Sequence, residues 1–261
     1  MISSVNIGYG AILVILASFL VTLVSGISLG QKPSIRGLKG NSTPSGPAAA
    51  TGRVMSKKYS WELDEKATLA KSSFPIKPAA LIERAKQVID GDLLNADDFS
   101  EEFVFQFPYV GPLSKAEYLK AVSGFKIKDT FPDLNSGMHN FHVDPMRPNR
   151  VWFMVDFVAT HSGEGPFGKP TGIEVECPPQ VNSLTFDAKG KVIKYTGGYV
   201  VDKDIGNSGG MGGIFGPLYA IGKGFPFPEG KPYSRSWQFK LFSAVGGAAQ
   251  KASSIFGKKD E

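Results

Sequence analysis

The acidic and aromatic side chains of the strand-rich second half of the chain are the residues that could do chemistry. Asp156 stands in the apolar run 151–160 and shares one strand face there with Trp152, Met154 and Val158. A carboxylate held among apolar side chains is a useful acid/base next to a carbonyl group. Asp156 is therefore a candidate catalytic residue, with Trp152 and Met154 as candidate ligand contacts. The alternative is that this face of the strand lies toward solvent.

The three histidines do not have the spacing of a metal site. His139 and His142 alternate onto opposite faces of one expected strand, so they cannot chelate one ion together without a bulge. His161 stands close to Glu164 in a loop, an arrangement more typical of a surface. We expect no metal site, and His139 remains a candidate ligand contact.

Cysteine content and charge exclude several classes of protein. The single cysteine, Cys177, rules out a disulfide framework and a multi-cysteine zinc site. It stands in an alternating stretch before two prolines, which favours a buried strand cysteine over a nucleophile. The net charge is +5, but the basic residues are scattered along the chain. Nucleic-acid-binding proteins usually concentrate such charge on one face, so no nucleic-acid partner is expected.

Residues 1–30 form an apolar segment that predicts contact with a membrane. Residues 1–31 contain no charged side chain, and the run 7–29 is almost wholly apolar. A run of this length can span a bilayer of about 30 Å. Positive residues follow the run, which for an uncleaved anchor keeps the next domain on the cytoplasmic side. A cleaved signal for the secretory pathway or a plastid is the alternative, since the run ends in small residues.

The chain after this segment divides into three parts. Residues 31–74 begin as a basic stretch rich in Gly, Pro and Ser and are expected to be a linker or a targeting stretch. Residues 75–202 carry the patterns of a folded domain. Residues 203–261 are expected to hold a glycine-rich loop and an amphipathic tail.

The periodicity of residues 75–202 changes from helical to strand-like. Pro78 opens an amphipathic pattern that Gly91 can end, and Ser114 with Glu117 forms a capping box ahead of a second helix. Alternating phenylalanines at 103–107 predict a strand. Further strands are expected at 151–160, 173–177, 181–187 and 191–202. Helices followed by a meander of strands indicate an α+β domain.

Residues 203–261 depart from this regularity. Nine glycines lie from Gly206 to Gly230, but no Lys-Ser/Thr pair follows them, which argues against a phosphate-binding loop. We expect an ordered flap over a pocket or a loop that faces a membrane. The run 237–256 mixes apolar residues with Lys and Ser and predicts a weakly amphipathic helix. That helix would contact a membrane, a partner or its own domain.

The order of several local motifs is similar to that of a known family. These motifs are the turn Phe131–Leu134, the strand 151–160, the loop motifs His161–Glu164 and Pro170–Gly172, the hairpin 186–193 and the strand end Tyr199–Asp202. In this order, residues of roughly 76–202 resemble the SnoaL-like polyketide cyclases of the nuclear transport factor 2-like superfamily. The resemblance implies a cone-shaped, highly curved antiparallel sheet packed on the N-terminal helices around a mostly apolar pocket. This fold hosts many activities, so no single reaction is implied.

The resemblance adds further candidate residues. Asp202 lies where the last strand of the family carries an aspartate, which makes it a second candidate acid/base. Tyr118 and Tyr199 would line the cone and offer hydroxyl groups to a ligand. Proteins of this fold frequently pair, so a homodimer is also expected.

Two functions remain open. The chain is either a membrane-targeted module that binds a hydrophobic small molecule without catalysis, or a cyclase or isomerase that needs no cofactor. The enzyme would act on a hydrophobic, carbonyl-bearing metabolite such as a polyketide, terpenoid or pigment, with Asp156 or Asp202 moving the proton. The sequence does not identify the ligand or the organelle.

Overall fold

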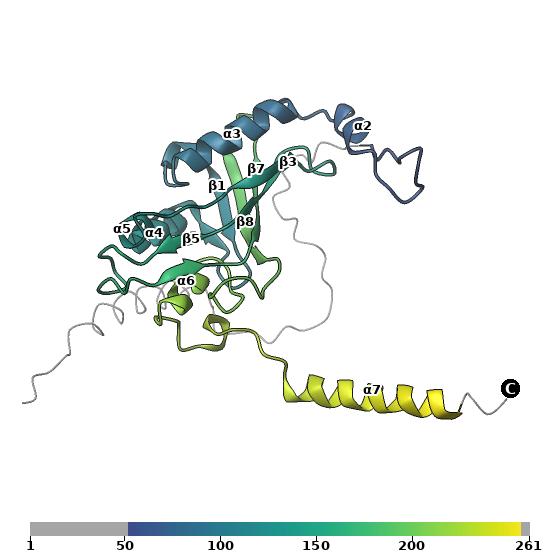
Figure 1. Cartoon of the computed structure of the whole chain (residues 1–261). Coiled ribbons are helices and arrows are strands. Elements are labelled where there is room, and N and C mark those ends of the chain that lie inside the picture. Colours follow the sequence, from purple (N-terminus) through teal and green to yellow (C-terminus); the bar gives the residue numbers. More distant parts are fainter. Residues whose placement is uncertain (1–51, 257–261) are drawn as a thin grey trace, which may run out of the picture.

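The computed structural model describes residues 52–256 and shows a six-stranded sheet, a two-stranded sheet and helices around them (Figure 1). The predicted anchor or signal segment, 1–30, lies outside the described residues. Within 52–256, no helix combines the length and the apolar character that crossing a membrane requires.

Helices and strands follow one another along the chain in the α+β order that the sequence predicts. The helices are α2 (Glu65–Ala70), α3 (Pro78–Asp90), α4 (Lys115–Phe125), α5 (Ile127–Thr130), α6 (Phe215–Ala220) and α7 (Trp237–Phe256), with the short 3₁₀ turns η1 (Ala96–Asp98) and η2 (Pro228–Gly230). The strands are β1 (Phe99–Gln106), β2 (Leu113–Ser114), β3 (His139–Val143), β4 (Arg150–Val155), β5 (Val158–Thr160), β6 (Glu174–Glu176), β7 (Gln180–Phe186) and β8 (Val192–Val200).

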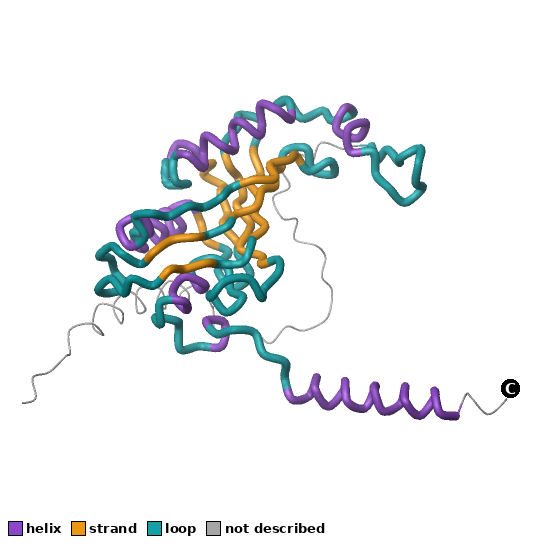
Figure 2. Tube along the Cα trace, in the orientation of Figure 1, coloured by secondary structure: helices purple, strands orange, loops and turns teal. Residues whose placement is uncertain are grey.

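The large sheet has the strand order β2-β1-β8-β7-β4-β3. Its neighbours are antiparallel except for β1 and β8, which run parallel, so the sheet is mixed rather than wholly antiparallel. Register shifts in the β1–β8, β3–β4 and β7–β8 pairs mark irregularities of the bulge kind, which bend a sheet. Figure 2 shows the strands of the large sheet as a twisted group beside the helices, with the β5–β6 pair apart from it.

Local sequence signals explain where the two main helices begin. Pro78 occupies the first turn of α3, where its missing N–H costs no hydrogen bond. The Ser114 side chain and the Glu117 side chain cap each other's backbone at the start of α4, which confirms the predicted capping box. α3 packs against β3 and β4, whereas α4 packs against β1 and β2. The two helices therefore cover different parts of the sheet.

The expected continuous strand 151–160 is wrong, because the chain leaves the large sheet at Asp156 and Phe157. β4 ends at Val155 and pairs with β7, but β5 pairs with β6 in the small sheet. Backbone bonds to a preceding segment hold the bend: the Asp156 N–H donates to Ser136 O over 2.9 Å. The apolar run 151–160 therefore contains two strands, β4 and β5, which belong to different sheets.

The main core lies between α3, α4 and the large sheet. Leu81, Ala85 and Val88 of α3 are fully buried, as their helical spacing predicts. They join the inward side chains of the strands, among them Phe99, Phe153 and Leu184, in one cluster. This packing defines the inner face of the large sheet, which is also the face that carries the candidate site.

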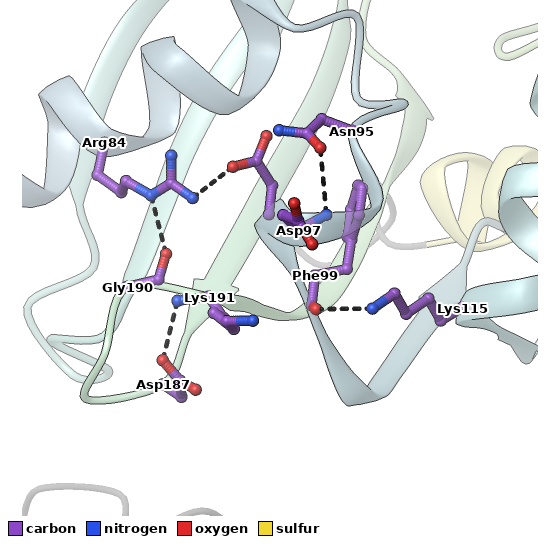
Figure 3. Close-up of polar contacts among 9 residues, drawn as sticks. Arg84, Asn95, Asp97, Phe99, Lys115, Asp187, Gly190 and Lys191 are labelled. Carbon is purple, nitrogen blue, oxygen red and sulfur yellow. Dashed lines mark hydrogen bonds and ion pairs between the residues drawn. The ribbon is translucent and has the colours of Figure 1, made fainter.

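Arg84 ties α3 to two distant parts of the domain (Figure 3). Its Nε donates to Gly190 O over 2.9 Å at the turn between β7 and β8, and a terminal nitrogen pairs with Asp98 at 2.6 Å. The Asp187 carboxylate accepts the N–H of Lys191 within the same turn, which confirms the predicted hairpin. In the same view, Lys115 Nζ at the start of α4 donates a hydrogen bond to Phe99 O at the start of β1, over 3.2 Å.

A second, smaller core lies under the β5–β6 hairpin. Phe131, Val175, Leu218 and Ile221 are buried there, with Phe167 beside them. Leu218 and Ile221 come from α6 and its C-cap, so the glycine-rich segment packs on the domain whose sequence pattern ends at residue 202.

Candidate functional site

A cavity of about 1130 Å³ lies between the inner face of the sheet, α4 and the glycine-rich segment. Its walls are mostly apolar and include Phe105 of β1, Val122 of α4, Val155 of β4 and Met211. Pockets for drug-sized ligands reach about 1,000 Å³, so this space is large enough for a multi-ring or long-chain molecule.

Two buried tyrosines place hydroxyl groups in this apolar lining. Tyr118 of α4 and Tyr195 of β8 both line the cavity, with ring centroids 6.2 Å apart. Phe105 packs against both rings, at 5.0 Å and 5.5 Å. Burial, and to a smaller extent the neighbouring Tyr195, raises the pKa of Tyr118, and burial raises the pKa of Tyr195. Both hydroxyls are therefore protonated at neutral pH and can donate a hydrogen bond.

The two hydroxyls have little to bind within the protein. The Tyr195 hydroxyl lies 3.5 Å from Asn182 Oδ1, the long limit of a hydrogen bond. Among the described residues, the Tyr118 hydroxyl has no hydrogen-bond partner. Because Tyr118 is only 2% exposed and lines the cavity, its hydroxyl is available to a molecule inside it.

Asn182 is the third polar group of the inner wall, and a glycine makes room for it. Its Oδ1 accepts the Gly198 N–H over 3.1 Å, and its Nδ2 donates to Gln180 O over 3.2 Å. A Cβ on Gly197 would lie 1.8 Å from Asn182 Oδ1, so only glycine fits at that position. Gly198 has φ +73, and a Cβ there would collide with the Phe107 ring. The two glycines thus let β8 pass close to Asn182.

The glycine-rich segment forms one wall of the cavity. The Gln180 side-chain oxygen accepts the Gly213 N–H over 2.6 Å, which fastens the segment to β7. A Cβ on Gly212 would lie 2.6 Å from Gly198 O, so the segment approaches β8 backbone to backbone. Of the two roles expected for these glycines, a flap over a pocket agrees with this placement.

Charged residues surround the cavity only at its exposed edge. The lining contains Asp92, Lys126, Lys128, Asp129, Glu229 and Lys231, and all of them are exposed. Lys128 pairs with Asp92 at 2.6 Å. The buried part of the lining, among the described residues, carries no carboxylate, lysine or histidine. The chemistry that it offers is hydrogen bonding by neutral groups.

Asp156 does not lie in this cavity, and the prediction that it sits in an apolar hollow is wrong. Val155 and Phe157 line the cavity, and the alternation of the chain points Asp156 away from it. Its side chain is 38% exposed and lies 3.5 Å from His139 Nδ1. The pair stands on the outer side of the sheet.

The other predicted ligand contacts on this strand face are also outside the cavity. Trp152 donates its ring N–H to Asp144 over 3.1 Å and stacks under Arg150, whose guanidinium carbon is 3.8 Å from the ring centre. Met154 accepts a contact from Asn140 and lies with Trp152 along a shallow outer depression. His139 is exposed and contacts Gly137 O over 2.7 Å.

Asp202 is a turn residue rather than a member of the cavity wall. It is exposed, has φ +56 and follows the end of β8, where its carbonyl accepts the Ile205 N–H. The structure therefore does not bring Asp156 and Asp202 to one site. Of the predicted residues, Tyr118 and Tyr199 do line the cavity, and Tyr199 is half exposed at its edge.

Sequence reasoning missed Asn182, Gln180 and Tyr195. A signal was present in β7, where Gln180 and Asn182 stand two residues apart and therefore share one face of a strand that is otherwise mostly buried. Polar residues at inward positions of a buried strand need partners, and here the partners are Gly198 and Gly213.

Two other reactive side chains lie in the second core, away from the cavity. Cys177 is 2% exposed, and burial raises the pKa of its thiol to about 12, as a buried structural cysteine requires. His161 was expected at the surface, but its side chain is 0% exposed, which corrects that expectation. Its Nδ1 contacts Thr171 Oγ1 at 3.0 Å, and its Nε2 has no partner among the described residues. Burial, and then the charge of Lys223, lowers the pKa of His161.

Comparison with known proteins finds similarity at the level of solved structures alone. No family model matches the chain, and no curated protein does. A protein assigned as a hydroxylase from Streptomyces galilaeus is 21% identical, over 66% of this chain and 90% of its own, with a TM-score of 0.37. A protein assigned as a SnoaL-like polyketide cyclase from Jannaschia is 16% identical, over 46% and 85%, with a TM-score of 0.38.

A third match has the same character. It is a protein assigned as a polyketide cyclase from Streptomyces antibioticus, 18% identical over 46% of this chain and 88% of its own, with a TM-score of 0.35. Solved structures of proteins assigned as SnoaL-like are therefore among those that this chain resembles. At 16–21% identity and TM-scores below 0.5, the three likenesses assign neither a family nor an activity, so the function has to be argued from the cavity of this chain.

Proposed function

We propose that this chain is a small-molecule-binding module that holds a mostly apolar ligand in the cavity beside Tyr118 and Tyr195. The observation that carries the proposal is a pair of protonated hydroxyls in an apolar wall, one of them without a partner among the described residues. The Tyr118 hydroxyl faces the cavity, so a ligand oxygen could accept its hydrogen bond in place of water. The ligand class is therefore a multi-ring or long-chain molecule that carries a carbonyl oxygen.

Binding is favoured over acid/base catalysis because of where the carboxylates stand. A general acid or base must come within about 3 Å of the proton that it moves, directly or through one water. Asp156 faces His139 on the outer side of the sheet, and Asp202 occupies an exposed turn. The cavity residues bind and orient, and none of the buried ones is poised to exchange a proton at neutral pH.

The test compares a tricyclic aromatic ketone with the hydrocarbon that lacks its carbonyl group, using titration calorimetry on the full chain. The variants Tyr118→Phe and Tyr195→Phe each remove one hydroxyl and keep the ring. We expect each to weaken ketone binding by about 5–10-fold and to leave hydrocarbon binding unchanged, since one hydrogen bond contributes roughly 1 kcal/mol.

Asp156→Asn is the matched control and is expected to bind both compounds as the unaltered chain does. The proposal is wrong if both tyrosine variants bind the ketone normally. It is also wrong if Asp156→Asn loses the ketone selectively, which would return the outer face to consideration.

We also propose that residues 1–30 attach the chain to a membrane by a single span. The support is the uncharged run 7–29, which is long enough to cross a bilayer, and the positive residues that follow it. The test is the mass of the mature chain together with its extraction by alkaline carbonate. An intact N-terminus in the pellet supports an anchor, whereas a shortened chain in the supernatant indicates a cleaved signal for the secretory pathway or a plastid.

We also propose that the chain forms a homodimer, as the sequence leads us to expect. The molecular mass of the protein in solution tests this proposal.

A further inference from the structure

Helix α7 stands apart from the domain. It extends away from the sheet and the other helices (Figure 1), and among the described residues no element packs closely against it. Gly246 and Gly247, in the middle of the helix, have open space where a side chain would point. Since it is not held by tertiary packing, α7 must gain its stability elsewhere.

The sequence of α7 is a poor one for an isolated helix. A pair of adjacent glycines costs roughly 2 kcal/mol relative to alanines, and helices of this length are marginal alone in water. Helices without tertiary contacts form when an apolar face is buried against a partner surface. The identity of that partner can be argued from the two faces of the helix and from its charge.

One face of α7 is apolar and exposed. Trp237, Leu241 and Val245 recur every four residues and so lie on one side of the helix. Their exposed fractions are 69%, 57% and 61%, and the adjacent Phe242 is 75% exposed. Ser243 lies on the opposite side beside Phe239, which is 50% exposed, and Lys240 lies at the margin of the apolar face. A helix with most of its large apolar side chains on one face and a lysine at the margin is suited to lie in a bilayer surface, where the lysine can reach the headgroups.

The charge of the residues around this apolar face indicates which kind of membrane surface it would bind. The segment 231–261 contains six basic residues, Lys231, Arg235, Lys240, Lys251, Lys258 and Lys259, and only two acidic ones, Asp260 and Glu261, at its end. Such a segment is attracted to anionic lipid headgroups. Pairing α7 with the same helix of a second copy would instead bring like charges together.

We propose that α7 lies in the surface of an anionic lipid bilayer, with Trp237, Leu241, Phe242 and Val245 among the acyl chains and Lys231, Arg235 and Lys240 at the headgroups. This contact is separate from the predicted span at residues 1–30 and does not depend on a ligand in the cavity. α7 would hold the domain against the membrane and bring the cavity close to a source of apolar molecules.

The test uses local probes, so that contact by α7 is separated from any contact by the N-terminal segment. The full chain carries one added cysteine, Val245→Cys on the apolar face or Ser243→Cys on the polar face, labelled with a polarity-sensitive fluorophore. The native Cys177 is 2% exposed, and the unaltered chain serves as the labelling control. Vesicles are pure phosphatidylcholine or phosphatidylcholine containing phosphatidylglycerol.

With phosphatidylglycerol vesicles we expect a blue shift and a several-fold rise in emission at position 245, and a much smaller change at position 243. Pure phosphatidylcholine should give little response at either position. Replacing Lys231, Arg235 and Lys240 by glutamine should lower the partition coefficient, read at position 245, on the order of 100-fold.

Four results would overturn the proposal. They are no response to any vesicle, equal responses at the two positions, a lipid-free response that grows with protein concentration, and a probe at position 245 already shielded in the free monomer. The third identifies a second copy as the occupant of the apolar face, and the fourth identifies another segment of the same chain.

Discussion

The two faces of β4 both carry apolar residues but lie in opposite surroundings. Val151 and Phe153 on the inner face are 0% and 1% exposed and belong to the main core. Trp152 and Met154 on the outer face are partly exposed and lie beside ionic or polar partners. Apolar neighbours in the sequence therefore did not place Asp156 in an apolar environment. A side chain's surroundings are decided by which face the helices and the cavity cover.

The largest expected difference between the two faces is in stability. Phe153→Ala should lower the free energy of unfolding by about 3–5 kcal/mol, because it removes a buried ring and leaves a cavity in the core. Met154→Ala, one residue away, should lower it by about 1 kcal/mol or less, because its site is already open to solvent. Urea unfolding of the two variants measures both. Equal losses would show that the assignment of inner and outer faces is mistaken.

A smaller difference separates two glycines, one on the inner face and one outside it. Gly197→Ala places a methyl group 1.8 Å from Asn182 Oδ1 and should cost about 2 kcal/mol or more, with displacement of Asn182. Gly124→Ala, in α4 with open space around it, should stabilise the chain by about 0.5–1 kcal/mol. Thermal melting compares the two. Tolerance of alanine at position 197 would contradict the close approach of β8 to Asn182.

The smallest expected effect distinguishes a buried histidine from an exposed one. His161 has its pKa lowered from 6.5 by burial and then by Lys223, so the folded chain binds its proton less readily than the unfolded chain does. Its contribution to stability is present above pH 6.5 and is lost as the pH falls from 6.5 through the lower pKa of the folded chain. His161→Gln should therefore make the melting temperature less dependent on pH between about 7 and 5.

The exposed His142 provides the control for the substitution itself. His142→Gln should melt at the same temperature as the unaltered chain at pH 7, because its side chain is not part of the core. An unaltered pH profile in His161→Gln would contradict the buried and neutral state of His161.

The sequence predicted local structure well where a single segment determines it. The capping box at Ser114, the start of α3 at Pro78 and the turn before Lys191 depend on neighbouring residues and are confirmed. The break between β4 and β5 depends on distant pairing partners, which the apolar run 151–160 does not reveal. The parallel pairing of β1 with β8 is likewise a property of the whole sheet.

The site was predicted in part for the same reason. Tyr118 and Tyr199 were placed at the cavity through the family resemblance, and they do line it. Asn182 and Tyr195 come from two adjacent strands, and only their pairing brings the amide and the hydroxyl together. Strand alternation shows which residues share one face of a sheet, but it does not show which of the two faces lines a cavity.

The central claim is that the cavity beside Tyr118 receives a ligand, and native mass spectrometry of the full chain tests it most directly. The probe is the tricyclic ketone, added to the unaltered chain, to Ala121→Trp and to Ala80→Trp. Ala121 lines the cavity from α4, whereas Ala80 is exposed on α3. We expect one ketone per chain in the unaltered protein and in Ala80→Trp, and a clearly lower occupancy in Ala121→Trp, because the indole takes up part of the cavity. Equal ketone binding by Ala121→Trp would contradict the claim.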